Sequence, residues 1–292
     1  MMEVMHPQIE DVFRIHLPVF RWMSARVASA ATLPPLYQAR SNRRPMDIRK
    51  NHLVNGVLYA IVSLGAIIGT MLGMQGLLYV CKPLMMIVLS SWFFFNSRRV
   101  GDRFTLLVQL GLFFSLIGDI ALMFEHSDEF YFLIGLGSFL LAQLCYTLAF
   151  AHNVADAGAG HGLLISTGLA AMIIAFGVLF GSMVLEKVDS TVIVPVSVYS
   201  FAIVLMGVGA ALRYGRSFLP SFVMVFVGAL LFITSDSILA TSRFVQPVEH
   251  AKWSVLLTYA AAQYLIARGC LRHVLDPEEI RRRAALRAER IS

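Results

Sequence analysis

The sequence predicts an all-α, polytopic integral membrane protein built as an eight-helix transmembrane bundle. The first observation behind this fold class is composition: the 292 residues are 58% hydrophobic and only 14% charged, with a mean hydropathy of +0.71. A soluble domain normally carries about 25% charged residues to cover its surface. Much of the surface of this chain must therefore face lipid. The apolar runs and the placement of the basic residues lead to the same fold class.

Eight apolar runs are long enough to span a membrane, since a spanning helix needs about 20 mostly apolar residues. They lie at residues 53–73, 76–95, 104–124, 130–151, 162–182, 192–212, 219–240 and 252–271. The runs define a membrane domain at 53–271, between a basic N-terminal tail at 1–52 and a basic C-terminal tail at 272–292. The three cysteines are scattered within the runs, so the sequence predicts neither a disulfide framework nor a CxxC metal site.

The basic residues test the span count independently. With eight spans, 20 Lys and Arg residues fall on one side of the membrane and 3 on the other. The positive-inside rule then predicts that both tails are cytoplasmic. The net charge of +6 comes from these flanking segments rather than from a nucleic-acid-binding face, so no nucleic-acid partner is expected. The hydropathy fits a bacterial inner membrane and an endoplasmic reticulum membrane equally.

Residues 12–30 of the N-terminal tail mix apolar and arginine positions. One interpretation is a short helix that lies on the membrane surface. A second is a targeting segment, although the acidic residues just before it and its broken apolar stretch match a signal peptide poorly. A weakly ordered basic extension is the third.

Short matches between the two halves of the membrane domain predict two four-helix repeats, related by a parallel duplication. The matches are Gly118-Asp119 with Ser235-Asp236, Ala142-Gln143 with Ala262-Gln263, and Pro83 with Pro195.

Three ionisable residues lie well inside the predicted spans: Lys82, Asp119 and Asp236. Each costs at least roughly 2.5–3.5 kcal/mol in hydrocarbon, which makes a functional role the first hypothesis. Lys82 lies near the start of its run, and the two aspartates lie near the ends of theirs, all on the same side. The three groups should therefore share a layer roughly 6–9 Å beneath one surface.

Polar residues of the other spans could line a cavity in that layer. We take them, together with Lys82, as candidates for substrate binding or for tuning the protonation of the aspartates. They are Ser115, Ser138, Gln143, Tyr146, Tyr199, Ser235, Tyr259 and Gln263. Serine and tyrosine are also ordinary helix-packing residues, and Lys82 could simply neutralise one aspartate. A purely structural polar layer is therefore an alternative.

Two buried carboxylic acids can divide their roles, because one can stay protonated while the other is ionised. Such a pair suits acid-catalysed cleavage through an oxocarbenium-like cation, proton relay in a transporter, or water activation in an aspartic protease. All eight histidines lie outside the spans, so no metal site is expected. The chain also lacks a G-x-S-x-G elbow, nucleotide-binding glycine motifs, and the GxGD and PAL signatures of intramembrane aspartyl proteases.

Several segments, in order, resemble the YhhN/TMEM86 family of lysoplasmalogenases. They are Lys82-Pro83-Leu84, SLIGDIALM at 115–123, FYFLIGLGSFLLAQLCYTLAF at 130–150, GALLFITSDSILATSRF at 228–244 and TYAAAQYLIAR at 258–268. The resemblance runs from the second span to the eighth and does not include the N-terminal tail. It departs from the family at Gln143, where the family is associated with a histidine, and this argues against an acid–base role at that position.

The resemblance implies an eight-span hydrolase that cleaves the vinyl ether bond of a lysoplasmalogen. This lysophospholipid substrate would yield a fatty aldehyde and glycerophosphocholine or glycerophosphoethanolamine. The two essential aspartates of the family map onto Asp119 and Asp236, and no cofactor is implied. We hypothesise that one aspartic acid protonates the enol-ether β-carbon while the other, ionised, stabilises the oxocarbenium ion and orients water. Lys82 would hold the substrate phosphate or tune an aspartate. The alternative is a proton-coupled lipid or small-solute transporter.

Overall fold

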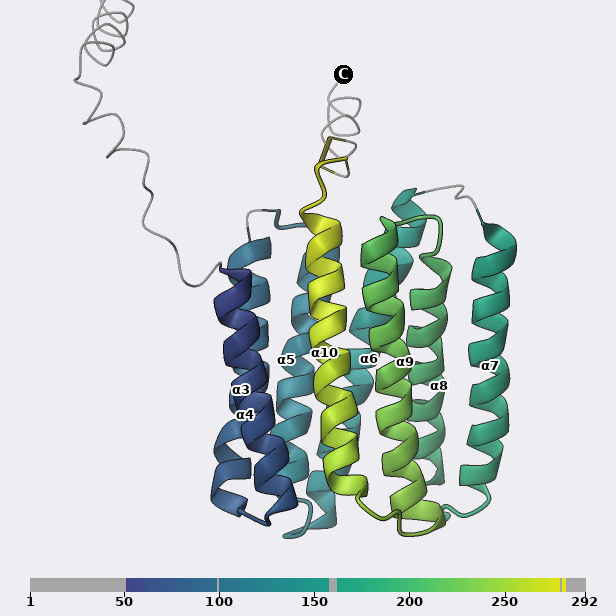
Figure 1. Ribbon diagram of the computed structural model, residues 1–292. Helices are drawn as coiled ribbons and strands as arrows, with labels where there is room; N and C mark the ends of the chain where they lie inside the picture. The colour runs from purple at the N-terminus through teal and green to yellow at the C-terminus, as the bar shows by residue number, and fades with distance from the viewer. Residues whose placement is uncertain (1–50, 99, 158–161, 279, 282–292) are drawn as a thin grey trace, which may run out of the picture. The chain divides into compact units, whose positions relative to one another are not determined.

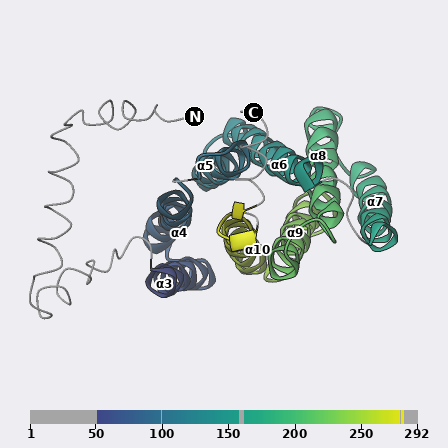
Figure 2. The ribbon, with the colours of Figure 1, turned by 90° about the horizontal axis from the view of Figure 1, so that it is seen from above.

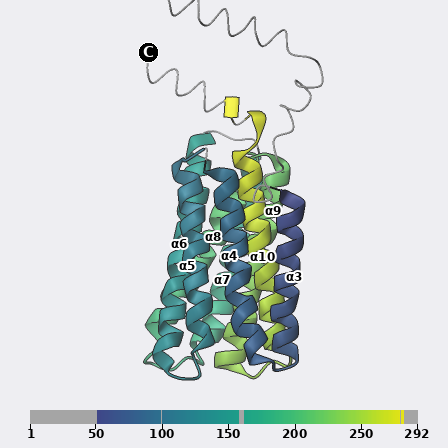
Figure 3. The ribbon, with the colours of Figure 1, turned by 90° about the vertical axis from the view of Figure 1, so that its left-hand side faces the viewer.

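The computed structural model describes residues 51–98, 100–157, 162–278 and 280–281, and long helices make up most of them. These helices run side by side between the two ends of a bundle (Figure 1, Figure 3). They are α3 His52–Met71, α4 Gln75–Ser97, α5 Arg103–Met123, α6 Glu129–Ala157, α7 Leu163–Leu185, α8 Ile193–Leu212, α9 Leu219–Ala240, the short π-helix η2 Thr241–Val245, and α10 Ala251–Val274. The predicted all-α bundle of eight long helices is confirmed. Segment 12–30 and residues 282–292 lie outside the described residues.

The helix bounds agree with the predicted runs to within three residues, except at α6, which continues to Ala157 rather than ending at residue 151. Polar caps help to set two of the starts. The side chain of Asn51 accepts a 3.0 Å hydrogen bond from the backbone of Leu53, and Asp102 accepts one of 2.9 Å from Thr105. Such caps supply partners for the N–H groups that the first turn of a helix leaves unpaired.

Seven of the helices, α3 to α9, are long and apolar enough to cross a membrane, so the chain is a multi-pass membrane protein. The eighth, α10, is as long but less apolar, because it carries Lys252, Arg268 and Arg272. Lys252 and Arg272 are exposed near the two ends of α10, and Arg268 is half-buried. The helix itself packs against α3, α4, α5 and α9 near the middle of the bundle (Figure 2), and 13 of its 24 residues are buried.

Helix α7 is the opposite case. It packs chiefly on α8, lies at the edge of the bundle (Figure 2), and has only 4 of its 23 residues buried. Its sequence is apolar on all sides, as expected for a helix that is surrounded mostly by lipid.

Each half of the domain contains an equivalent close contact between two of its own helices. A Cβ atom added to Gly111 of α5 would lie 2.5 Å from the ring of Tyr146 on α6, and one added to Gly228 of α9 would lie 2.9 Å from Ile266 on α10. Each glycine lies two turns before the aspartate of its helix, and each contacted residue lies three positions after the glutamine of the Ala-Gln match. This equivalent packing supports the predicted duplication.

Candidate active site

One cavity of about 510 Å³ lies at the end of the bundle where α5, α7 and α9 finish and α4, α6, α8 and α10 begin. Pockets for small molecules typically have volumes of about 300–1,000 Å³. The lining includes six of the candidate residues, namely Lys82, Asp119, Tyr199, Ser235, Asp236 and Tyr259. The two aspartates, which are far apart in the sequence, therefore reach one shared cavity.

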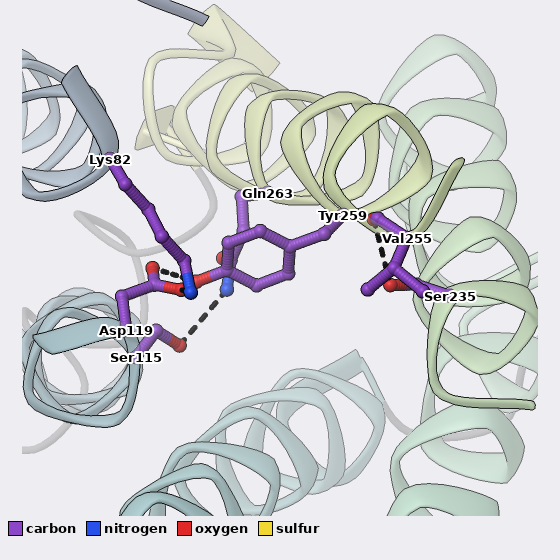
Figure 4. Close-up of polar contacts among 7 residues, drawn as sticks. All are labelled: Lys82, Ser115, Asp119, Ser235, Val255, Tyr259 and Gln263. Atoms are coloured by element: carbon purple, nitrogen blue, oxygen red, sulfur yellow. Dashed lines mark hydrogen bonds and ion pairs between the residues drawn. The ribbon is translucent and has the colours of Figure 1, made fainter. Parts of the chain in front are cut away.

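Asp119 of α5 has two polar partners within the bundle. Its carboxylate lies 3.4 Å from the ammonium group of Lys82 on α4 and accepts a 2.7 Å hydrogen bond from the hydroxyl group of Tyr259 on α10. Figure 4 shows the Lys82 and Tyr259 side chains converging on this carboxylate from two different helices. Asp119 is only 2% exposed, so the interaction is little screened by water. Lys82 thus lies beside one aspartate, in the arrangement that neutralises that acid.

Asp236 of α9 has a different environment. Its carboxylate accepts a hydrogen bond from the hydroxyl group of Tyr199 on α8. Within the described ranges, no Lys, Arg or His side chain forms an ion pair with it. The neighbouring Ser235 donates instead to the backbone carbonyl of Val255 on α10 at 3.0 Å, which ties α9 to α10 beside the cavity (Figure 4). The two aspartates thus differ in one respect that matters chemically: only Asp119 has a cation beside it.

Aromatic packing holds Tyr259 in place. Its ring meets Phe139 of α6 and Phe232 of α9 edge-on, with centroid distances of 5.8 and 5.5 Å. Edge-to-face pairs of this kind favour one ring orientation. The surrounding core therefore orients the hydroxyl group of Tyr259 toward Asp119, and this hydrogen bond helps to fix the position of the Asp119 carboxylate.

The other five candidate residues do not line the cavity. Three of them form a buried chain behind Asp119, in which Tyr146 donates to Gln263 at 2.8 Å and Gln263 donates to Ser115 at 2.9 Å. Ser138 donates to the carbonyl of Ile134 in its own helix. These contacts match a helix-fastening role and place none of the four at the cavity surface.

Gln143, the fifth, is fully buried in α6, and its side-chain amide lies beside the hydroxyl group of Tyr199 but forms no hydrogen bond of standard geometry with the residues that the structure describes. A buried amide without partners is costly, by about 1–3 kcal/mol for each unsatisfied group. Its position does not give it access to the cavity as described.

An apolar arm of the cavity extends toward α7 and α8. Phe176, Gly177, Phe180 and Gly181 of α7 form one of its walls, and Val204 belongs to the α8 side. The arm thus adjoins the helix that is most exposed to lipid. The lining of this arm suits a hydrocarbon chain, because a hydrocarbon chain gains most of its binding energy from the burial of apolar surface.

Sequence reasoning did not select the ionisable residues at the rim of the cavity. They are Glu125 and His126 from the α5–α6 connection, Arg243 from η2, and Lys252 from the start of α10. All four lie in or next to connections, so the cavity reaches the surface at this end. Arg243 and Lys252 are two of the three basic residues on this side of the predicted topology. The scarcity of basic residues on this side was the sequence signal that could have identified them as candidates.

Within the described part of the chain, no group of three or more His, Cys, Asp or Glu side chains is arranged to hold a metal ion, and the three cysteines are free. The cavity lining includes the carboxylates of Asp119 and Asp236, the hydroxyl groups of Tyr199 and Tyr259, and the ammonium group of Lys82. The fold and this site together define a multi-pass membrane protein with an acid-lined pocket inside the helix bundle.

Comparison with known proteins agrees with this class and narrows it. The profile of the YhhN family matches residues 77–270, and the chain belongs to that family. The match runs from the start of α4 almost to the end of α10 and so includes every element of the cavity that carries a carboxylate or a tyrosine.

Several relatives carry a functional name. The chain is 30% identical to the lysoplasmalogenase TMEM86B of Rattus norvegicus over 192 residues, which are 66% of this chain and 71% of the relative. It is 30% identical to the Homo sapiens lysoplasmalogenase TMEM86B over 65% of this chain and 74% of the relative. A lysoplasmalogenase of Mycobacterium tuberculosis (strain CDC 1551 / Oshkosh) is 32% identical over 47% of this chain and 50% of the relative. No solved structure matches the chain.

Proposed function

We propose that this protein is a membrane-embedded lysoplasmalogenase. It hydrolyses the vinyl ether bond of a lysoplasmalogen and releases a fatty aldehyde and a glycerophospho-base. The names of the relatives support the substrate class. The observation that carries the proposal is the shared cavity, in which one carboxylate stands beside a lysine and the other does not.

This difference assigns a role to each acid. The ammonium group of Lys82 stabilises the carboxylate form of Asp119. Among the described residues, Asp236 is partnered by a tyrosine hydroxyl group and by no cation, so it is the acid that can be held protonated in the cavity. Asp236 is therefore the proton donor, and Asp119 is the anion that faces the developing positive charge.

The reaction then balances with one water molecule. The Asp236 proton moves to the β-carbon of the vinyl ether, whose double-bond electrons form the new C–H bond and leave an oxocarbenium ion. Water adds to the cationic carbon and gives a proton to Asp119, which produces a hemiacetal. Collapse of the hemiacetal returns one proton from its hydroxyl group to Asp236, while Asp119 gives its proton to the departing glycerol oxygen. Both acids end in their starting states.

The cavity accommodates both parts of such a substrate. The apolar arm between α7 and α8 takes the alkenyl chain, and the charged rim takes the glycerophospho headgroup. The vinyl ether, which joins the two parts, then lies in the stretch of cavity that contains the aspartates. A lysolipid could enter with its chain in hydrocarbon and its headgroup in water.

The bias of basic residues supports a topology with both tails in the cytoplasm, so the cavity opens on the opposite face of the membrane. A C-terminal green fluorescent protein fusion, expressed in bacteria, should be fluorescent. A dark fusion together with an active C-terminal alkaline phosphatase fusion would reverse this orientation.

Aldehyde release by the purified protein in detergent tests the function directly, since hydrolysis needs no membrane gradient and transport does. Asp119→Asn and Asp236→Asn should each lower kcat by about 10²–10⁴-fold, the usual contribution of a general acid or base. Asp128→Asn is the matched control, because Asp128 is exposed at the same end and outside the cavity lining. Full activity in both variants would disprove the mechanism. Absence of aldehyde release by the wild-type protein would disprove the function.

A further inference from the structure

The C-terminal end of α9 changes geometry just beyond the catalytic region. The α-helix gives way at Thr241 to the π-helix η2, which carries Arg243 to the rim of the cavity. π-Helical turns are rare and are often found at functional sites. Arg243 lies seven positions after Asp236, which corresponds to about 10 Å of helix rise.

Two elements besides η2 hold the Arg243 side chain. Its Nη1 atom lies 3.2 Å from a carboxylate oxygen of Glu125 in the α5–α6 connection. Its guanidinium group lies over the ring of Phe132 on α6, at 3.7 Å from the centroid, and Phe132 in turn meets Phe244 of η2 edge-on. The arginine is thus pre-oriented, while 34% of its side chain remains exposed.

The guanidinium group still has unused hydrogen-bonding capacity. Arginine has five N–H donors in a planar fork. Among the described residues, Glu125 is the one acceptor that Arg243 contacts. Planar guanidinium groups bind carboxylates and phosphates through the same paired N–H geometry. The carboxylate of Glu125 therefore occupies, on the guanidinium group of Arg243, a position at the mouth of the cavity that a phosphate group could take instead.

We infer that Arg243 binds the phosphate of the lysophospholipid headgroup. Phe132 keeps the guanidinium group oriented, and Glu125 neutralises it until the substrate phosphate displaces the carboxylate. The assignment rests on the proposed function, since it takes the vinyl ether to lie near the aspartates and the headgroup to lie at the rim. A short glycerol linker between ether and phosphate matches the short axial separation of Asp236 and Arg243.

Paired substrates test this inference. In Arg243→Gln, the apparent KM for a lysoplasmalogen should rise by about 10- to 100-fold, the range expected for losing hydrogen bonds to a charged group. The KM for an alkenylglycerol, which has the same vinyl ether and no phosphate, should not change. Arg272→Gln is the matched control, because Arg272 also lies over a phenylalanine ring, that of Phe218 at 5.7 Å, but at the opposite end of the bundle.

Glu125→Gln gives a result of opposite sign. Removal of the competing carboxylate should lower the KM for the lysoplasmalogen by severalfold and strengthen inhibition by glycerophosphocholine. Sodium phosphate at the same concentration should inhibit less than glycerophosphocholine if the site recognises a lipid phosphodiester.

If the Arg243–Glu125 pair served only to hold the α5–α6 connection, both single variants would lose stability and activity together. Equal effects of Arg243→Gln on both substrates would likewise overturn the assignment while leaving the hydrolase function intact.

A binding measurement separates failure of this site from failure of the proposed function. Ester-linked lysophosphatidylcholine and a monoacylglycerol of the same chain length can compete for a fluorescent lysolipid, with no cleavage required. Arg243→Gln should weaken the phospholipid by about 10- to 100-fold and leave the monoacylglycerol unchanged. This result would support the phosphate site even in a protein that released no aldehyde. Equal affinities in wild type and variant would refute the site even in an active enzyme.

Discussion

The two ends of the bundle each bury charged side chains, and they do so in different ways. At the cavity end, Lys82, Asp119 and Asp236 line an open space of about 510 Å³. At the other end, Arg213 just beyond α8 is fully buried, and its guanidinium group is packed between side chains rather than beside the described cavity. One end keeps its charges available to a ligand, and the other encloses its charge within protein.

The Arg213 cluster joins the ends of several helices. Arg213 donates to Asn153 of α6 at 2.7 Å and to Ser221 of α9 at 3.1 Å, and it lies over the ring of Phe150 at 5.4 Å. Asn153 also pairs with His273 of α10 at 3.0 Å. The comparison shows that burial of an ionisable group does not by itself identify a functional site. The group must also face a space that a ligand can enter.

The largest expected effect on the fold follows from removing Asn153, which bridges a buried guanidinium group and an imidazole. Asn153→Leu takes away one acceptor of Arg213 and one partner of His273 in a single step. Since an unsatisfied buried polar group costs about 1–3 kcal/mol, and a charged one more, the variant should lose several kcal/mol of stability. A thermal melt in detergent measures the loss, and the activity of the protein that remains folded should stay normal.

Asn153→Asp sharpens the same comparison. It keeps the acceptor for Arg213 and adds a compensating charge, so its melting temperature should stay near that of the wild type or exceed it. A cavity-end variant such as Asp236→Asn should show the reverse pattern, with activity lost and the melting temperature retained. If Asn153→Leu instead abolished aldehyde release without lowering the melting temperature, the distinction between the two ends would be wrong.

A smaller effect should distinguish the two acids within the cavity. Tyr199→Phe removes the hydroxyl partner of Asp236, whereas Tyr259→Phe leaves Asp119 with its lysine. One neutral hydrogen bond contributes about 0.5–1.5 kcal/mol, so kcat should fall by up to about tenfold in Tyr199→Phe and by less in Tyr259→Phe. Steady-state kinetics with a lysoplasmalogen would measure both.

The comparison of the two tyrosine variants can also contradict the assignment of Asp236 as the proton donor. The two variants remove the same atom from the same kind of residue, which makes each the control for the other. A larger loss of kcat in Tyr259→Phe would mean that the hydrogen bond to Asp119 matters more than the one to Asp236. The assignment of Asp236 as proton donor would then have to be reversed.

The sequence could predict the helices and the shared layer because both depend on local properties. A run of apolar residues specifies a spanning helix wherever it packs, and depth along the helix places Lys82, Asp119 and Asp236 at one level. The prediction of which polar side chains line the cavity was less accurate. Tyr199 and Tyr259 reach the aspartates, but Ser138 turns back to its own helix, because the direction of a side chain around a helix depends on which neighbours it meets.

Residues beyond the spans were harder still. Arg213 and Arg243 both follow the ends of apolar runs and would ordinarily be read as basic connections in water. Packing buries the first among side chains of α5, α6 and α9 and fixes the second on Phe132. Apart from the scarcity of basic residues on the side of Arg243, composition and periodicity do not reveal either environment, since each is formed by segments far apart in the chain.

An effect of similar size is expected on the lipid-facing side of the cavity. Gly181 of α7 lines the apolar arm, and a Cβ atom added there would meet nothing within 4 Å. Gly181→Leu should therefore fill part of the arm without disturbing the fold. Because hydrocarbon pockets discriminate by roughly 1–3 kcal/mol per methylene group, the KM for long-chain lysoplasmalogens should rise by about tenfold relative to that for short-chain ones.

Gly168→Leu is the control for this change, because Gly168 belongs to the same helix, has equally open surroundings, and lies outside the cavity lining. It should leave the chain-length preference unchanged. The ratio of kcat/KM for long and short substrates isolates the effect from any general loss of activity. An unchanged ratio in Gly181→Leu would move the alkenyl chain out of the α7–α8 arm. The substrate would then have to lie in the opposite direction, with its chain toward α3 and α4, where Gly69, Thr70 and Leu78 form the other wall of the cavity.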